Sequence, residues 1–458
     1  MGETEAARAL LSARAVRERA RDMLRLCEAD QLSHWRLDRA RLPEIADFTL
    51  AVMRDNYPDL IIPFHARWQH FAAGGKDRWS AVAARAGWNG AAARARAEFD
   101  LAIVSVLLDA GAGPAWRYRE ADGSVSSRSE GLAVASLEMF AAGLFSGRKE
   151  DPLRADAARL ARLTARDLAT GFQVHCDNPL VGLAGRVDLL NRLGRACLDA
   201  PEVFARDDSA RPGGLFDFLS QNKNDAFGPP APLRGGAGAG DGPGVASRDF
   251  ARGYPHPDPP RKEEGQDAPR PQDAGSLPAE AILAAVLAHL GPIWPSRLSL
   301  GGVALGDTWR HPGIRADGAT DGHVPFHKLS QWLSYSLIEP LQRAGFNVAD
   351  IDGLTGLPEY RNGGLFVDFG ALVPKKADEV SAPHTVDSGF VVEWRALTVA
   401  LLDEIAALIR KRLDLSAEQM PLAKVLEGGT WAAGRRIAAQ KRADGSPPLD
   451  IVSDGTVF

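Results

Sequence analysis

Ionisable side chains alternate with glycines between positions 291 and 370, and this stretch holds most of the residues that could do chemistry. A segment built only for packing would show a plain apolar period with one solvated face. Within the stretch, LGDTWRHP places Asp307 and Arg310 in a predicted loop beside Trp309. Loops held by a rigid scaffold commonly carry catalytic residues. The stretch is therefore predicted to contain an active site.

A second group of polar residues lies in the segment GLTGLPEYRNGG. Glu359, Tyr360 and Arg361 stand between glycines and a proline, on a backbone that is expected to turn tightly and display its side chains. Asp352 precedes the first of these glycines. A carboxyl group in apolar surroundings can acquire a raised pKa and donate a proton while a neighbouring carboxylate stays ionised. Glu359, Asp352 and Asp307 are therefore the candidate catalytic carboxylates.

Simpler structural roles exist for each of these residues taken alone. Asp352 could cap a turn, and Tyr360 could lie in the core. Arg395, in EWRALTV, could hold an anionic ligand, since guanidinium groups suit phosphate and carboxylate, or it could pair with Glu393 or another carboxylate. Trp294, Trp309 and Trp332 could stack on a base-like or planar ligand, although core packing is the commoner fate of tryptophan. The density of such residues, rather than any one of them, carries the prediction of a site.

The chain has no GxxxxGK[ST] phosphate loop, no GxSxG elbow and no HExxH motif. His323 and His327 are four residues apart, as two metal ligands on one helix face would be. Pro325 between them disfavours a helix at that point, so no metal ion and no other cofactor is expected. His65 and His70 are expected to be packing or surface residues.

The composition is that of an ordinary globular enzyme, with 45% hydrophobic and 25% charged residues among 458. A net charge of −5 argues against a nucleic-acid partner. The three cysteines are widely spaced and fit neither a disulfide framework nor a zinc knuckle. The charged N-terminus lacks an apolar signal core, and the longest apolar run, LAIVSVLL, is too short to cross a bilayer. A cytoplasmic protein without a membrane partner is expected, and no oligomeric state is predicted.

Helices dominate the elements that must position these residues. Apolar spacing predicts one short strand over 296–305 and helices over 5–30, 42–55, 59–72, 90–110, 130–145, 180–200, 278–290, 326–341, 391–413 and 430–441. A further helix is predicted over 151–171, with Asp151 as cap and Pro152 in its first turn. Ser127 stands three residues before Glu130, which predicts a capping box. The predicted fold is mainly α with small β elements.

The segment 228–276 divides the chain. It contains 10 glycines and 10 prolines, a density that excludes helices and central strands, and it is predicted to be a disordered insertion. Residues 1–227 form a helical N-terminal part. Residues 277–458 form a helical C-terminal part that carries most of the candidate site, and the two parts are expected to pack into one core.

Nine segments of the chain resemble those of a known family, that of uracil catabolism protein four, which is also classified as a domain of unknown function. In chain order these segments are RSEGLAVASLEMF, NPLVGLAGRVDLL, GPIWPSRLSLGG, LGDTWRHP, VPFHKLSQWLSYSLIEPL, DGLTGLPEYRNGGL, EWRALTVALLDE, LEGGTWAAGRRIA and SDGTVF. The resemblance covers nearly the whole chain outside 228–276. It implies a role in a route of uracil degradation in which uracil becomes a nucleotide before its ring is opened. A protein resembling GTP cyclohydrolase opens the ring, and a ribosylurea-type intermediate leads to urea and a three-carbon acid.

A more distant likeness concerns the triplet Glu359-Tyr360-Arg361. It is similar to an Asp-Tyr-Arg triplet of the queuosine salvage proteins, which are mainly helical nucleotide N-glycosidases with a fold like that of DNA glycosylases. This likeness implies a helical core of the DNA-glycosylase type. It also agrees with the need of the pathway to separate urea from a sugar.

The resulting hypothesis is a hydrolase that cleaves the N-glycosidic bond of ribosylurea or of its 5′-phosphate, giving urea and ribose or ribose 5-phosphate. Such a reaction passes through an oxocarbenium-like transition state and needs a carboxylate and a proton donor. The catalytic candidates are Glu359, Asp352, Asp307 and Tyr360. The residues expected to bind the substrate or its phosphate are Arg361, Arg310, Lys328, His327, Trp309 and Arg395. Tyr360 or His327 is expected to protonate or orient the departing urea.

Two other functions fit the same sequence. The first is an amidohydrolase acting on the ring-opened intermediate, although amide hydrolysis commonly uses a metal ion or a nucleophile. The second is a scaffold or regulator that binds pathway enzymes or a pyrimidine nucleotide. In the leading hypothesis, the partner of the protein is a small molecule derived from a sugar or nucleotide.

Overall fold

The structure is a computed structural model that describes residues 2–206, 209–222, 276–294 and 298–452. The insertion predicted at 228–276 lies outside the described residues apart from Ser276. The predicted fold class is confirmed, because helices make up most of the described chain and its strands are two or three residues long, in two-stranded sheets. None of the described helices combines the length and the apolar character that crossing a membrane requires.

The helices before the insertion are α1 Glu3–Leu10, α2 Ala13–Glu28, α3 Leu42–Asn56, α4 Arg67–Phe71, α5 Arg78–Ala83, α6 Ala91–Leu107, α7 Arg128–Ala141, α8 Ala157–Leu160, α9 Ala165–Gly171, α10 Leu183–Asp199, α11 Pro201–Phe204 and α12 Gly214–Gln221. Those after it are α13 Ala279–Leu290, α14 Lys328–Arg343, α15 Tyr360–Asp368, α16 Gly389–Leu413, α17 Leu422–Val425 and α18 Trp431–Lys441. A single π-helical turn, η7 Leu426–Thr430, joins α17 to α18.

The strands form small pairs, some between neighbouring segments and others between segments far apart in the sequence. The antiparallel pairs are β1 Trp35–Leu37 with β12 Leu372–Pro374, β2 Tyr118–Arg119 with β3 Val125–Ser126, β4 Ala205–Arg206 with β5 Ser209–Ala210, β7 Ser299–Leu300 with β8 Val303–Ala304, and β9 Thr308–Arg310 with β10 His323–Pro325. The parallel pairs are β6 Ser276–Pro278 with β11 Asn347–Ala349 and β13 His384–Thr385 with β14 Ile451–Val452.

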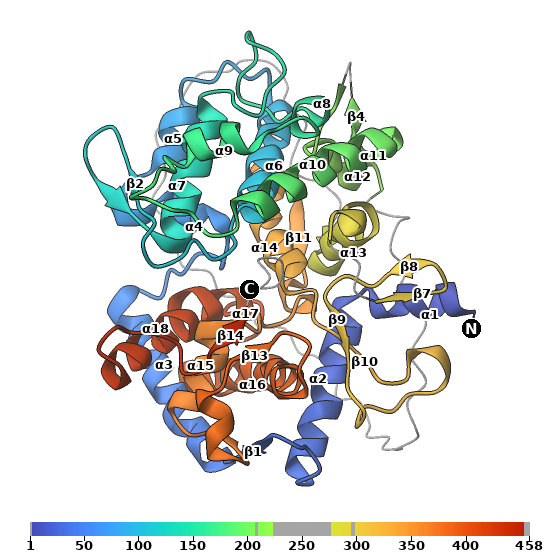
Figure 1. Cartoon of the computed structure of the whole chain (residues 1–458), viewed down its shortest axis with the longest axis vertical. Helices are drawn as coiled ribbons and strands as arrows, with labels where there is room; N and C mark the ends of the chain where they lie inside the picture. The colour runs from blue at the N-terminus through green and yellow to red at the C-terminus, as the bar shows by residue number, and fades with distance from the viewer. Residues whose placement is uncertain (1, 207–208, 223–275, 295–297, 453–458) are drawn as a thin grey trace, which may run out of the picture.

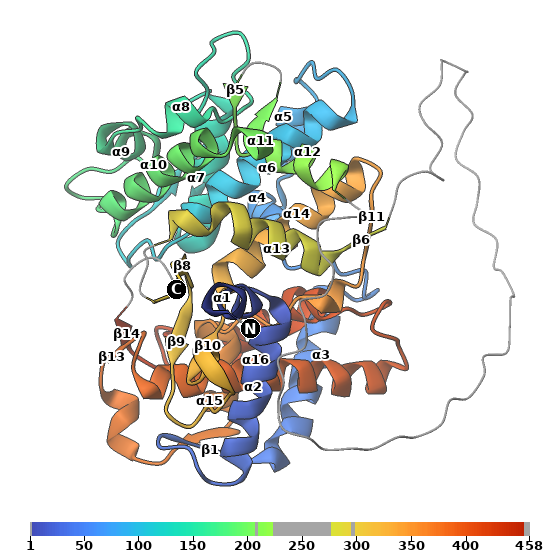
Figure 2. The ribbon, with the colours of Figure 1, turned by 90° about the vertical axis from the view of Figure 1, so that its right-hand side faces the viewer.

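The helices gather into two lobes (Figure 1, Figure 2). The first lobe consists of residues 67–221 and holds α4 to α12. The second lobe consists of residues 3–56, 299–325 and 360–452, so the two ends of the described chain share it. Helices α13 and α14 lie between the lobes, and α14 contacts α4 and α6 of the first lobe. The first lobe is thus inserted into the sequence of the second.

Helix α16 forms the centre of the second lobe, where α2, α3 and α15 pack against it. Most of its 25 residues, Gly389–Leu413, are buried, and a helix that is apolar on nearly all sides needs neighbours all round. Buried apolar residues form one connected core from Ala13 to Ile451, with members in both lobes.

Apolar spacing predicted most of the long helices within a few residues. The predictions over 42–55, 90–110, 180–200, 278–290, 391–413 and 430–441 are confirmed as α3, α6, α10, α13, α16 and α18. The prediction over 5–30 splits into α1 and α2, because Ser12 caps a new helix by accepting the backbone N–H of Ala15.

Three local predictions are wrong. The helix predicted over 59–72 shrinks to α4, since Pro63 and the irregular segment before it interrupt the pattern. The helix predicted over 151–171 is only α8 and α9, and the capping box in this region belongs to Thr164 and Asp167. Ser127 does begin α7, but its side chain makes no capping hydrogen bond.

Candidate active site

Asp307 lies just before β9 and is held by three neighbours. Its carboxylate accepts hydrogen bonds from both terminal nitrogens of Arg395 at 2.8 Å, from Nε1 of Trp309 at 2.7 Å and from the backbone N–H of Lys328 at 3.1 Å. Burial alone would raise the pKa of Asp307, but the Arg395 charge and these donors hold it well below its usual range. Asp307 is therefore an ionised anchor that fixes the first residue of α14, and it has no proton to donate.

Arg395 is fully buried and faces the interior of the second lobe. Its guanidinium carbon lies 4.1 Å from the centroid of the Phe326 ring, a cation–π contact. The alternative partner considered from the sequence, Glu393, instead lies 3.1 Å from Nε2 of His311. Arg395 thus forms its ion pair with Asp307, and the buried Trp309 donates a hydrogen bond to the same carboxylate.

Three other predicted site residues are placed in separate surroundings. Nε2 of His327 lies 2.9 Å from the carbonyl oxygen of Leu10, and burial lowers the pKa of this histidine. Arg310 is exposed on β9. Asp352 pairs with Arg410 at 2.5 Å and accepts the backbone N–H of the first residue of α17 at 2.7 Å. The contacts of His327 and Asp352 therefore hold segments of the fold together.

Glu359 is the N-cap residue of α15. Its carboxylate accepts the backbone N–H of Arg361 at 2.8 Å and that of Asn362 at 2.5 Å, and such a cap favours a negative charge at the positive end of the helix. Glu359, Tyr360 and Arg361 are all half-buried. Nη1 of Arg361 donates to the carbonyl oxygen of Gly445 at 2.9 Å. The tight turn predicted here is wrong, because the triplet begins a helix.

Glycines in and beside α15 permit close helix packing. A Cβ atom on Gly363 would lie 2.3 Å from Cζ2 of Trp394 in α16, and one on Gly434 would lie 2.1 Å from the carbonyl oxygen of Arg361. Neither distance is possible, so only glycine allows α15 to fit between α16 and α18. The glycines therefore position the Glu359-Tyr360-Arg361 triplet by packing.

Lys328 connects these groups to the first lobe. Burial lowers the pKa of its ammonium group, and the charge of Glu359 opposes this shift; Arg395 adds to the lowering, whereas Asp109 and Asp307 also oppose it. The side chain is therefore within electrostatic range of three carboxylates from distant parts of the sequence. Lys328 remains partly accessible at the start of α14, where the lobes meet.

A set of polar and aromatic residues gathers at this meeting point, which we call the junction cluster. Helices α4 and α7 and the end of α6 supply one side, α14 the middle, and η7 with α18 the other side. Its members are His65, Arg67, His70, Asp109, Ser129, Glu130, Trp332, Glu427, Trp431 and Arg435.

Arg67 is the fully buried centre of the cluster. Its Nε donates to Oγ of Ser105 at 2.7 Å, and its Nη1 lies 2.9 Å from Asp109 and 3.2 Å from Nδ1 of His70. Because a guanidinium can only donate, Nδ1 of His70 accepts and Nε2 carries the proton. Burial, followed by the charge of Arg67, lowers the pKa of His70 to about 4. His70 is therefore neutral near pH 7.

Aromatic rings form the rest of the cluster. The His70 ring lies 5.7 Å from the Trp332 ring and 6.1 Å from the Trp431 ring, and His65 lies 6.4 Å and 6.3 Å from the same two rings, centroid to centroid. Nδ1 of His65 lies 2.8 Å from Glu427 in η7. Single π-helical turns inside α-helices occur frequently at functional sites.

The sequence did not predict the junction cluster. His65 and His70 had been expected to serve packing or surface roles, yet both take part in a buried polar group. Arg435 completes the cluster by pairing with Glu130 at 2.9 Å and covering the Trp431 ring at 4.8 Å. One signal was present: FHARWQHF, in the first half of the chain, holds two histidines, one arginine and one tryptophan in eight residues.

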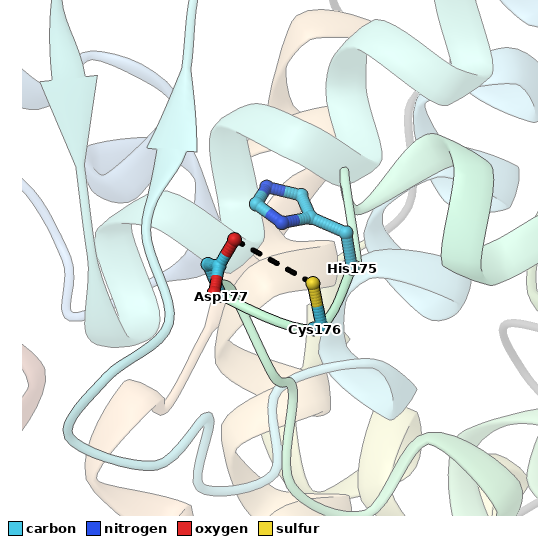
Figure 3. A group of neighbouring side chains, drawn as sticks. All are labelled: His175, Cys176 and Asp177. Atoms are coloured by element: carbon cyan, nitrogen blue, oxygen red, sulfur yellow. Dashed lines mark hydrogen bonds between the residues drawn. The ribbon is translucent and has the colours of Figure 1, made fainter.

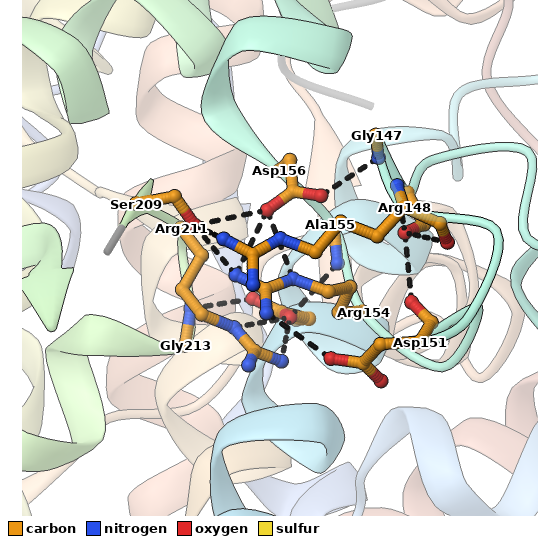
Figure 4. Close-up of polar contacts among 11 residues, drawn as sticks. Gly147, Arg148, Asp151, Arg154, Ala155, Asp156, Ser209, Arg211 and Gly213 are labelled. Carbon is orange, nitrogen blue, oxygen red and sulfur yellow. Dashed lines mark hydrogen bonds and ion pairs between the residues drawn. The ribbon is translucent and has the colours of Figure 1, made fainter. Parts of the chain in front are cut away.

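A second polar group lies within the first lobe and serves as a comparison (Figure 4). Arg211 pairs with the fully buried Asp100, while Arg154 donates to Asp156 at 2.9 Å and to Oγ of Ser209 at 2.7 Å. Asp156 and Ser209 also line an open cavity of about 730 Å³. We call this group the closed network, because the charges of these arginines and aspartates are paired with one another.

One group of potential metal ligands occurs in the described residues. His175, Cys176 and Asp177 are consecutive and exposed, and their ligand atoms lie within 4.8 Å of one another (Figure 3). Sγ of Cys176 lies 3.5 Å from a carboxylate oxygen of Asp177. The group contains no member of the predicted site or of the junction cluster.

Comparisons with known proteins extend over both lobes. A family model described as "Protein of unknown function (DUF1688)" matches residues 9–231 and 262–458. Protein urg3 of Schizosaccharomyces pombe (strain 972 / ATCC 24843) is 36% identical over 464 residues, covering 99% of this chain and 100% of that protein. Uracil catabolism protein 4 of Lachancea kluyveri is 34% identical over 477 residues, covering 97% of each chain.

Proposed function

This chain belongs to the DUF1688 family, and on that premise we propose that it acts in uracil catabolism by hydrolysing the N-glycosidic bond of ribosylurea or of its 5′-phosphate. The family resemblance seen in the sequence is confirmed by the full-length similarity to uracil catabolism protein 4. The pathway follows from the name of that relative. The reaction is inferred from the groups that meet at the lobe junction.

One observation carries the proposed reaction, namely the position of Lys328 among carboxylates at the junction. Glu359 from the second lobe and Asp109 from the first both lie within its electrostatic range. Two carboxylates beside a bound sugar stabilise the positive charge that develops on the anomeric carbon. An ammonium group whose pKa is lowered by burial is suited to give up a proton.

In the proposed step, the bond between the anomeric carbon and the urea nitrogen breaks, and the bonding electron pair stays with the nitrogen. Lys328 donates a proton to the departing urea, and a water molecule adds its oxygen to the anomeric carbon. The proton released by that water restores the ammonium group. His327, predicted from the sequence to help the departing urea, is less suited, because its ring nitrogen is held by the Leu10 carbonyl oxygen.

A 5′-phosphate would be held near Arg361. Burial lowers the pKa of Arg361 and Glu359 opposes the shift, whereas the positive charges of Arg435 and Arg128 add to the lowering. Positive charges from α7 and α18 thus act on the guanidinium group of Arg361 in α15, and a phosphate would offset them. The substrate preferred under this proposal is the phosphorylated compound.

The test is an assay of free urea after incubation of the protein with ribosylurea or with its 5′-phosphate. Glu359→Gln removes the charge and keeps one acceptor for the helix cap, so it should lower urea release by about 100-fold or more. Glu359→Asp keeps both the charge and the helix cap but moves the carboxylate away from the substrate. It therefore distinguishes a loss of catalysis from a loss of stability. Folded wild-type protein that releases no urea from either compound would overturn the proposal.

A separate measurement tests whether Arg361 binds the 5′-phosphate. Arg361→Ala should lower kcat/KM for the 5′-phosphate far more than for ribosylurea. An equal effect on both compounds would remove Arg361 from the phosphate site.

The amidohydrolase and scaffold functions remain predictions from the sequence, and stoichiometric zinc in purified protein would favour the first of them.

A further inference from the structure

We infer that Arg67, His70, Trp332 and Trp431 form a subsite for the planar ureido group of the substrate. The inference rests on the proposed function for the class of substrate, and it adds which side chains recognise the leaving group. Of these four residues, only Trp332 was considered from the sequence, as a side chain that could stack on a planar ligand.

Two buried donors in the junction cluster have no partner among the described residues. They are Nη2 of Arg67 and Nε1 of Trp332, on side chains whose residues are 0% and 6% exposed. Buried polar groups in proteins are nearly always hydrogen-bonded. Because guanidinium and indole nitrogens can only donate, the missing partner must supply acceptor oxygens. The guanidinium carbon of Arg67 also lies 5.5 Å from the centroid of the Trp332 ring, so the two side chains are neighbours.

The aromatic rings of the junction cluster favour a planar ligand. Trp332 and Trp431 both lie against His70, at 5.7 Å and 6.1 Å between centroids. Trp431 and His70 are partly exposed, so this side of the cluster can be reached from outside. Aromatic faces pack well against planar groups with delocalised electrons. Carbonyl compounds, carboxylates and ureido groups all meet the requirements stated so far.

The neighbouring carboxylates discriminate between these classes. The negative charges of Asp109, Glu130 and Glu427 all act on His70. An anionic ligand would be repelled by them, whereas a neutral ureido group would offer N–H donors to the carboxylates and its carbonyl oxygen to Arg67 and Trp332. A ureido group is the planar group that satisfies both sets.

Asp109 also relates the subsite to the reacting centre. It pairs with Arg67 at 2.9 Å and lies within the electrostatic range of Lys328. A ureido group bound against Arg67 therefore extends its glycosidic nitrogen toward the ammonium group that is proposed to protonate it. The subsite and the catalytic groups are two parts of one site at the lobe junction.

The experiment uses a ribosylurea analogue in which a cyclopentane ring replaces the ribofuranose ring. This carbocyclic compound cannot form an oxocarbenium ion, so its binding is measured by calorimetry without turnover. Trp332→Phe keeps a ring and removes only the N–H, and should weaken binding about tenfold. Arg67→Lys keeps the charge facing Asp109 and removes Nη2, and should weaken it by a similar factor.

Trp294→Phe is the matched control. Trp294 is also buried with an unpartnered Nε1 among the described residues, but it lines a separate cavity of about 20 Å³ beside Asp307 and His327. This variant should bind the analogue as the wild type does. Its unchanged affinity would show that the Trp332 effect comes from the ligand and not from the loss of any buried indole N–H.

Each outcome separates the subsite from the proposed reaction. Wild-type protein that binds the analogue in a Trp332-dependent way but releases no urea from ribosylurea would keep the subsite and overturn the hydrolysis. Urea release with a Trp332→Phe affinity equal to that of wild type would overturn the subsite and keep the hydrolysis. Failure of the wild type to bind the analogue, or acetate binding that is tighter than N-methylurea binding and depends on Trp332, would also overturn the ureido assignment.

Discussion

The junction cluster and the closed network are built from the same kinds of residues and differ in how their hydrogen bonds are used. In the closed network, Arg211 faces Asp100 and Arg154 faces Asp156, and the hydroxyl of Ser209 bonds both members of the second pair. In the junction cluster, Arg67 faces Asp109, but one of its terminal nitrogens has no hydrogen-bond partner in the part of the chain that the structure describes. Pairing completes the first group, whereas the second still requires acceptors.

This difference teaches that residue type alone does not distinguish a structural polar group from a binding one. Buried charges that are fully paired resist change, because removing one partner strands the other in a medium of low dielectric constant. Donors that stay unpaired keep the capacity to recognise a ligand. The two groups should therefore respond in opposite ways to mutation: stability should change in the closed network, and binding and turnover in the junction cluster.

The largest effect is expected from Arg211→Met in the closed network. It leaves the fully buried Asp100 without its guanidinium partner and should lower the free energy of unfolding by about 3–5 kcal/mol. Denaturant titration gives the value. Urea release per folded molecule should not change, and a selective loss of turnover without destabilisation would show that the closed network belongs to the active site.

Lys328→Met should have the next largest effect, and on turnover rather than on stability. It removes the ammonium group from among the carboxylates of Glu359 and Asp109, and urea release should fall about 100-fold. The fall should be smaller at alkaline pH, where the wild-type ammonium group also loses its proton. Lys441→Met, at an exposed position of α18, is the control. Equal activity of the two variants would remove Lys328 from the mechanism.

His70 should give the cluster a dependence of stability on pH. Burial lowers its pKa in the folded state to about 4, below the value of about 6.5 for an unfolded chain. Between these values the unfolded state binds more protons, so wild-type stability should fall as the pH drops from about 6.5 to about 4. His70→Gln should lessen this fall by on the order of 1 kcal/mol at pH 5.

The measurement for His70 is denaturant titration of both proteins at pH 7 and pH 5. The exposed His175→Gln variant should keep the wild-type pH dependence. An imidazole resonance of His70 that titrates near pH 6.5 would contradict the lowered pKa and the neutral state of the ring.

Asp352→Asn should produce the smallest effect. The substitution weakens the ion pair with the partly exposed Arg410 and keeps an oxygen that can accept the first N–H of α17, so it should cost about 1 kcal/mol or less in stability. Urea release should be unchanged within twofold. A large loss of activity would restore Asp352 as a catalytic carboxylate and weaken the contrast between structural and functional charges.

Much of the fold could be predicted because the information is local. The apolar spacing of α3 and α16 lies within each helix, and the prediction of both was confirmed. Glu359 was singled out from the sequence as a catalytic candidate, and the structure places it as the N-cap of α15, in a helix and not in the predicted turn. Local patterns indicated where charged residues are dense, and they did not indicate which of those residues meet.

The junction cluster could not be predicted for the same reason. His65 finds its partner in Glu427, and Asp307 finds its partner in Arg395, from distant segments of the chain. No local period relates such positions, because they meet only through the packing of elements that are far apart in the sequence. A search for density of histidine, arginine and tryptophan in short windows would have selected FHARWQHF without identifying what it contacts.

The insertion of the first lobe into the sequence of the second determines the order in which the protein can be completed on the ribosome. Helices α2 and α3 emerge first, yet their apolar faces are covered by α16, which is synthesised near the end. The first lobe, contiguous over residues 67–221, is available to fold earlier as a unit. Until α16 emerges, α2 and α3 expose surface that chaperones recognise, so truncation before Gly389 should yield a chain with a formed first lobe and an aggregating remainder.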